Sequence, residues 1–132
     1  MNKRAFSLLL LLLPSYGSAA EPALDYSRVL GSYRGEVENG DGIYTVVTTF
    51  TLMSGGRLRG EYHIEGVADP LRGYLTGARP EGNRQVSFEW QDRDGEGYTV
   101  LQFSRDYASF SGWWADYDSD RMHVWTGERF SD

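Results

Sequence analysis

Apolar and polar residues alternate with a period of two along most of this chain, a pattern typical of half-buried β-strands. The clearest example is Val86, Phe88 and Trp90, whose neighbours in the chain are polar. After the first twenty residues, no stretch has the period of a helix of useful length. We therefore predict eight strands, over residues 29–38, 43–53, 57–65, 71–78, 84–91, 97–104, 109–116 and 122–130.

Short segments rich in Gly, Asp, Asn and Pro separate these strands, and residues 39–42, 54–56 and 80–83 are examples. Such residues favour tight hairpin turns, which make consecutive strands antiparallel neighbours. An all-β chain of this kind can protect its sheet edges by closing on itself. The predicted fold is one domain, a single eight-stranded antiparallel up-and-down (meander) β-barrel over residues 29–130.

The first twenty residues differ from the rest. Lys3 and Arg4 precede an apolar run over residues 8–13, and small residues follow at 18–20. This order is typical of a cleavable secretory signal peptide, and the apolar run is too short to span a bilayer comfortably. We predict a signal peptide at 1–20, a short lead at 21–28 and a periplasmic or secreted location. The chain has no cysteine, which excludes disulfides and a lipoprotein anchor.

Without the signal peptide, the chain keeps 19 acidic residues and its basic residues are all arginine. Its net charge is then strongly negative. This balance argues against nucleic acid and anionic membranes as partners. It allows a cationic ligand or a basic protein as a partner, although solubility alone would also explain it.

A glycine two residues before an aromatic residue recurs in three predicted strands: Gly31 and Tyr33, Gly60 and Tyr62, and Gly112 and Trp114. With Arg129 near the end of the last strand, this pattern resembles the calycin barrels, the lipocalins and avidins. Those families have Gly-x-Trp on the first strand and a basic residue that packs over the tryptophan from the last strand. The resemblance implies that Arg129 packs over Tyr33, which stands in place of the usual tryptophan, and closes the barrel floor.

In a meander barrel, every second turn lies at the same end. The turns after the first, third, fifth and seventh strands are rich in carboxylates, whereas the other end has most of the arginines. The acidic end is the predicted mouth. Its predicted acidic rim consists of Asp92, Asp94, Glu96, Asp116, Asp118 and Asp120.

Inward-facing aromatic residues also separate into two groups. Towards the mouth we expect Tyr44, Tyr62, Trp90 and Trp114 as ligand-binding residues, with Tyr98 as a fifth candidate. Towards the floor we expect Tyr33, Phe50, Phe103, Phe110 and Phe130. Tyr and Trp rings suit a small apolar or cationic ligand. An eight-stranded barrel is wide enough either for a pocket or for a solid plug of these side chains, and both alternatives stay open.

Residues for catalysis or metal binding are sparse. His63 and His123 are far apart in the sequence, and no nucleophile elbow or phosphate loop is present after the signal peptide. Residues 116–120 have alternating carboxylates like the start of a calcium loop, but Arg121 stands where its glycine would be. We therefore predict no catalytic residues, no metal site and no cofactor.

Trp113 and Trp114 are adjacent, so one of them must point out of the barrel. An outward Trp beside Tyr117 could mark a protein contact or a dimer interface, and monomer and dimer both remain open.

The leading hypothesis is a binding protein that holds a small apolar or cationic ligand in its mouth. The alternative is a protein-binding or inhibitory module whose acidic rim docks a basic partner such as a cell-wall hydrolase.

Overall fold

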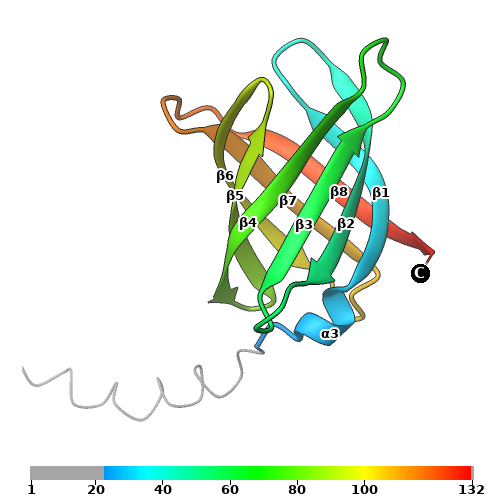
Figure 1. Ribbon diagram of the computed structural model, residues 1–132, viewed down its shortest axis with the longest axis vertical. Coiled ribbons are helices and arrows are strands. Elements are labelled where there is room, and N and C mark those ends of the chain that lie inside the picture. Colours follow the sequence, from blue (N-terminus) through cyan, green and yellow to red (C-terminus); the bar gives the residue numbers. More distant parts are fainter. Residues whose placement is uncertain (1–22, 132) are drawn as a thin grey trace, which may run out of the picture.

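A computed structural model describes residues 23–131, so the predicted signal peptide lies outside the described residues. The elements are a short helix, α3 (Tyr26–Val29), and the strands β1 (Gly31–Glu38), β2 (Ile43–Leu52), β3 (Leu58–Ile64), β4 (Leu71–Gly82), β5 (Gln85–Asp92), β6 (Gly95–Phe103), β7 (Ser109–Asp116) and β8 (His123–Ser131). They form a closed antiparallel barrel in sequence order, which confirms the predicted fold (Figure 1). Within residues 23–131, no helix has the length and apolar character needed to cross a membrane.

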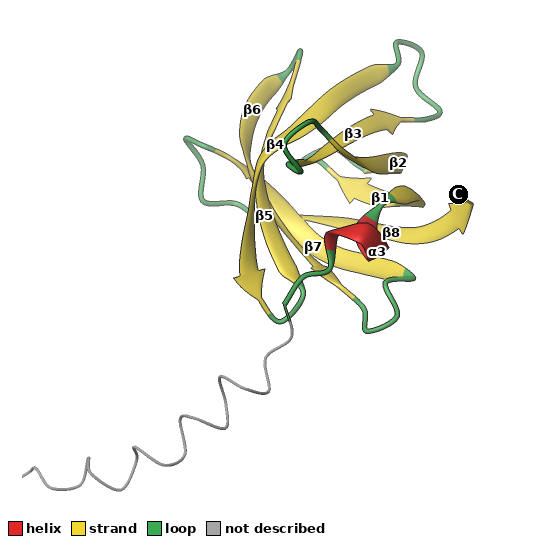
Figure 2. Cartoon of the chain, turned by 60° about the horizontal axis from the view of Figure 1, so that its bottom comes forward, coloured by secondary structure: helices red, strands yellow, loops and turns green. Residues whose placement is uncertain are grey.

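Pairing of β8 with β1 closes the barrel, and Tyr33 stands opposite Arg129 in this pair. The turns alternate between two ends. The β1–β2, β3–β4, β5–β6 and β7–β8 turns surround the end that we call the mouth, at the top of Figure 1. The remaining turns and α3 lie at the other end, the floor (Figure 2). The acidic turns therefore share one end of the barrel, as the order of the turns predicts.

The floor half of the barrel is filled by interlocking aromatic rings. Tyr33, Phe50, Phe103 and Phe110 are each no more than 3% exposed, and their ring centroids lie 5.4–6.0 Å apart. Most pairs meet edge to face, the arrangement that ring quadrupoles favour. Val29 of α3 is also fully buried, and α3 lies across this end of the barrel. The lower interior is therefore a solid core.

Arg129 ties β8 to this core. Its guanidinium carbon lies 4.6 Å from the centroid of the Tyr33 ring, which confirms the predicted contact. The same group donates to the Tyr33 hydroxyl, to the Leu30 carbonyl at 2.6 Å and to the Tyr107 carbonyl at 3.2 Å. One side chain thus joins the last strand, the first strand, the lead after α3 and the β6–β7 turn.

Phe130 does not belong to the floor core, and its inward placement was wrong. Its side chain is 46% exposed and lies under the Arg34 guanidinium, 4.5 Å from the ring centroid. Adjacent residues of a strand face opposite sides, and Arg129 takes the inward position.

Alkaline solution is expected to destabilise the protein through its buried tyrosines. Burial raises the pKa of Tyr33 to about 12, although the nearby Arg129 charge partly opposes this shift. An unfolded tyrosine ionises near pH 10, so below that pH the stabilising contribution is fully present. Above about pH 10 the unfolded chain loses the proton first, and stability falls until about pH 12. Chemical denaturation at a series of pH values should show this fall, with a shallower slope in Tyr33→Phe. Equal slopes in the two proteins would contradict the assignment to Tyr33.

Candidate functional site

The mouth of the barrel contains a pocket of about 250 Å³ above the filled floor. Its wall comes from β1, β3, β4, β5, β7 and β8 and from two of the turns, so it opens within the ring of strands rather than beside it. The lining residues are Val37, Asn39, Tyr62, Ile64, Leu71, Trp90, Asp92, Asp94, Trp114, Asp116 and Trp125. The volume lies just below the range of roughly 300–1,000 Å³ typical of drug-sized ligands.

Four aromatic side chains form the deeper wall of this pocket. Tyr62 and Trp125 meet edge to face with centroids 5.0 Å apart, and Trp90 and Trp114 do the same at 5.2 Å. Tyr62, Trp90 and Trp125 are only 2–6% exposed, whereas Trp114 is half-buried. The His123 ring stacks on Trp114 at a centroid distance of 4.5 Å. These contacts hold the rings in place before any ligand arrives.

Two glycines make room for these rings. A Cβ atom at Gly73 would overlap the Tyr62 ring and hydroxyl. A Cβ atom at Gly97 would overlap the Ala115 carbonyl oxygen and stand 2.7 Å from Trp90 Nε1. In the native chain, Trp90 Nε1 donates to that same Ala115 oxygen at 3.0 Å. Glycine at 97 therefore allows β6 and β7 to approach closely enough for the indole of Trp90 to reach β7.

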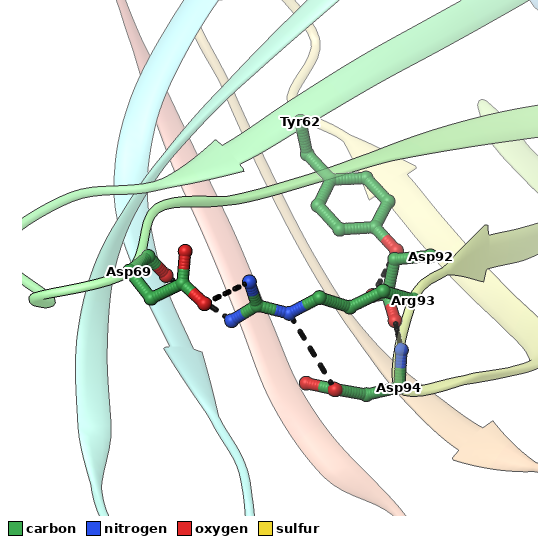
Figure 3. Close-up of polar contacts among 5 residues, drawn as sticks. All are labelled: Tyr62, Asp69, Asp92, Arg93 and Asp94. Atoms are coloured by element: carbon green, nitrogen blue, oxygen red, sulfur yellow. Dashed lines mark hydrogen bonds and ion pairs between the residues drawn. The ribbon is translucent and has the colours of Figure 1, made fainter.

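Asp92 is fixed at the edge of the pocket. Its carboxylate accepts from the Tyr62 hydroxyl at 2.7 Å and from the Asp94 backbone N–H at 2.8 Å (Figure 3). Burial, followed by this bond and the charges of Asp92 and Asp94, raises the pKa of Tyr62. The tyrosine therefore stays protonated and remains the donor to Asp92.

Arg93 points away from Asp92, across the mouth. Its guanidinium reaches the β3–β4 turn, where Nη1 lies 2.7 Å from Asp69 Oδ2 and Nη2 donates to the Asp69 carbonyl at 3.1 Å (Figure 3). Its Nε lies 3.7 Å from Asp94 Oδ1. Arg93 thus bridges two neighbouring turns of the rim and is not among the residues that line the pocket.

The structure brings together part of the predicted set of site residues. Tyr62, Trp90 and Trp114 line the pocket, and so do Asp92, Asp94 and Asp116 of the predicted acidic rim. Glu96, Asp118 and Asp120 lie at the same end but outside the lining.

Tyr44 lies apart from the pocket lining, although its ring packs against the core. Its hydroxyl donates to Asp41 in its own turn at 3.0 Å, and this bond raises the pKa of Tyr44.

Tyr98 faces outward, so its placement as a fifth inward aromatic was wrong. Its side chain is 39% exposed, packs edge to face on Trp113 at 5.4 Å and stacks on Tyr117 at 6.1 Å. Of the adjacent pair, Trp113 belongs to this outer cluster and Trp114 to the pocket. The two tryptophans therefore face opposite sides, as predicted.

Trp125 is a wall residue that was not among the aromatic residues expected at the mouth. It is 2% exposed, and its indole N–H donates to the buried Thr48 hydroxyl at 3.2 Å. A signal for it was available, because Trp125 lies four residues before Arg129 on the same face of β8. An inward Arg129 implies an inward Trp125.

Two larger hollows lie on the outer surface. One, of about 370 Å³, is lined by Tyr26, Arg57 and Arg59 among others, and one of about 330 Å³ lies beside Tyr98 and Tyr117. Neither has a wall of several buried aromatic rings, so we take the smaller mouth pocket as the candidate site. Among residues 23–131, no group of three or more His, Asp or Glu side chains is placed to hold a metal ion.

Comparisons with known proteins give the fold alone. No protein-family model matches the chain, and no curated protein matches it in sequence. Among solved structures, it is similar to a redesigned β-barrel, with a TM-score of 0.63 and 14% identity over 80% of this chain and 95% of that one. At this identity the similarity supports an eight-stranded antiparallel barrel. It is compatible with a calycin-like barrel at that coarse level.

Proposed function

We propose that the protein is an exported binding protein that holds a small apolar or cationic molecule in its mouth pocket. The observation that carries this proposal is the 250 Å³ pocket with a wall of Tyr62, Trp90, Trp114 and Trp125 above a filled floor. Pockets that are largely apolar and already formed are typical of small-molecule sites. The proposed export rests on the order of charged, apolar and small residues over 1–20.

The proposed role is binding rather than catalysis. The polar groups of the pocket are three aspartates and Asn39, and one of the aspartates, Asp92, is already held by Tyr62. Neither histidine is among the lining residues. The calycin resemblance is consistent with this role, since those barrels carry ligands in a mouth of the same kind.

Native mass spectrometry of the protein purified from its own host tests the proposal. We expect a retained small molecule, which should quench tryptophan fluorescence on rebinding because three tryptophans line the pocket. Protein that retains no molecule, and whose fluorescence responds to no small apolar or cationic compound, would contradict the proposal.

Adjacent tryptophans provide a matched pair of variants. Trp114→Ala removes part of the pocket wall and is expected to weaken binding of the retained molecule by about tenfold or more. Trp113→Ala removes the same side chain from the outer face and should leave the affinity unchanged. Fluorescence titration or calorimetry measures both. Equal losses in the two variants would show that the effect is structural and does not come from the pocket.

The outer cluster favours a second candidate function, docking of a basic protein such as a cell-wall hydrolase. Tyr117 is 53% exposed and stands next to Asp118, close in sequence to Asp120, in the β7–β8 turn. Aromatic residues are enriched at protein interfaces, and acidic ones steer basic partners. This function predicts salt-sensitive inhibition of such a hydrolase, lost in the double variant Asp118→Asn and Asp120→Asn. Inhibition that persists in this variant would exclude the acidic turn as the docking site.

A further inference from the structure

The hydrogen-bond donors of the aromatic wall are already used inside the protein. Trp114 Nε1 donates to the Glu38 carbonyl at 2.8 Å, Trp90 Nε1 to the Ala115 carbonyl at 3.0 Å and Trp125 Nε1 to Thr48 at 3.2 Å. The Tyr62 hydroxyl donates to Asp92. The wall therefore presents the faces and edges of its aromatic rings to a ligand. None of these four donors is left to form a hydrogen bond with that ligand.

Acceptors, in contrast, are present in excess. Three carboxylates line the pocket, from Asp92, Asp94 and Asp116. Asn39 has a side-chain N–H₂ group, but its Oδ1 accepts from the Asp41 backbone N–H at 3.0 Å. A bound anion would face three negative charges with one amide group to bind it. A ligand that donates hydrogen bonds and carries positive charge matches the pocket best.

Asp116 differs from the other two aspartates. Both oxygens of Asp92 accept hydrogen bonds, and exposed Asp94 lies near Arg93. Asp116 is half-buried, and within residues 23–131 its carboxylate has no hydrogen-bond or ion-pair partner. A half-buried carboxylate without a partner loses part of its hydration and gains most from a bound cation.

The Asp116 carboxylate and the Trp90 ring lie close together at the mouth. A Cβ atom at Gly95 would stand 3.6 Å from Trp90 Cη2 and 3.8 Å from Asp116 Oδ1. The Trp90 ring and the Asp116 carboxylate therefore flank Gly95 together, and both belong to the pocket lining. Both attract a cation, and the aromatic contribution increases when the cation is partly desolvated.

We propose that the mouth pocket is selective for an organic ammonium ion whose N–H groups bind Asp116 and whose apolar body lies against Trp90 and Trp114. This inference rests on the proposed small-molecule function and specifies its ligand class. The Arg93 guanidinium is paired with Asp69 of the β3–β4 turn and has no ion pair with Asp116.

Three probes of similar size and different charge test the selectivity: benzylammonium, benzyl alcohol and benzoate. We expect benzylammonium to bind at least about tenfold more tightly than benzyl alcohol in calorimetry at low salt, and benzoate to bind most weakly. Equal affinity for benzylammonium and benzyl alcohol, or tighter binding of benzoate, would overturn the inference while leaving a small-molecule pocket. Failure of all three to bind would count against the pocket function itself, and so against the inference.

Two aspartates close together in the sequence give a matched control. Asp116→Asn preserves the shape of the side chain and removes its charge, so it should remove most of the preference for benzylammonium over benzyl alcohol, leaving only the weaker attraction of Asp92 and Asp94. Asp120→Asn makes the same change on an exposed residue outside the pocket lining and should leave the preference for benzylammonium intact. Benzyl alcohol affinity should be the same in all three proteins, which separates charge recognition from damage to the fold. A preference that stays undiminished in Asp116→Asn, or is reduced equally in Asp120→Asn, would show that Asp116 does not bind the cation.

Discussion

Arg129→Ala is expected to lower the free energy of unfolding by about 3 kcal/mol. The substitution removes the cation–π contact with Tyr33 and leaves the Leu30 and Tyr107 carbonyls without their guanidinium donor. For a domain of this size, such a loss lowers Tm by about 10 °C or more. Thermal unfolding followed by circular dichroism measures it.

Two further variants separate the causes of this loss. Arg105→Ala removes an exposed arginine at the same end of the barrel and should change stability by no more than about 0.5 kcal/mol. Arg129→Lys keeps the charge but not the forked donor geometry, so it should recover only part of the lost stability. Similar Tm values for Arg129→Ala and Arg105→Ala would show that the floor does not depend on Arg129.

Gly97→Ala is expected to have an effect of comparable size, about 3 kcal/mol, although it adds a single methyl group. The new Cβ would overlap the Ala115 carbonyl oxygen, which belongs to the backbone of β7 and cannot rotate away. Relief requires β6 and β7 to separate, which breaks the bond from Trp90 Nε1 to the same oxygen. Chemical denaturation should therefore show lower stability, and the tryptophan emission of the folded state should shift as well.

Gly40→Ala is the matched control for this variant. Gly40 lies in the β1–β2 turn at the mouth, and a Cβ atom there would have no neighbour within 4 Å. Its φ is not positive, so alanine adds no backbone strain. The variant should be within about 0.5 kcal/mol of the native protein. Comparable losses of stability in Gly40→Ala and Gly97→Ala would indicate that the close approach of β6 and β7 is not the reason why residue 97 must be glycine.

Much of the fold could be predicted because the residues that specify each strand and each turn lie close together in the sequence. The period-two pattern and the turn residues locate all eight strands, and tight hairpins leave few alternatives to a meander. The main error in strand length lies in β4, which runs to Gly82 although Pro80 favours an earlier end. Irregular pairing with β5 on both sides of Pro80 accommodates the proline, and Asn83 and Arg84 form the turn with positive φ. Such irregularities depend on the partner strand and have no clear local signal.

The candidate site was harder to predict, because the sequence does not always show which face of a strand points into the barrel. Alternation locates Trp90 and Tyr62 on the inner face, but Tyr98 and Phe130 lie in strands that have apolar residues on both faces. Adjacent residues cannot both point inward, so Arg129 at the floor excludes Phe130 and requires Trp125. That the mouth is hollow while the floor is solid depends on how rings pack across the barrel, and contacts between distant strands are not visible in a linear pattern.

Closure of the sheet by β1 and β8 has a consequence for aggregation. A chain this rich in strands would present two long edges if the barrel were open, and exposed edges pair readily with other molecules. In the closed ring each strand from β1 to β8 has a neighbour on both sides. The junction of β1 and β8 is also where Arg129 crosses from one strand to the other. Opening that junction would expose both edges at once, so the chain's protection against self-association depends on the last strand remaining in place.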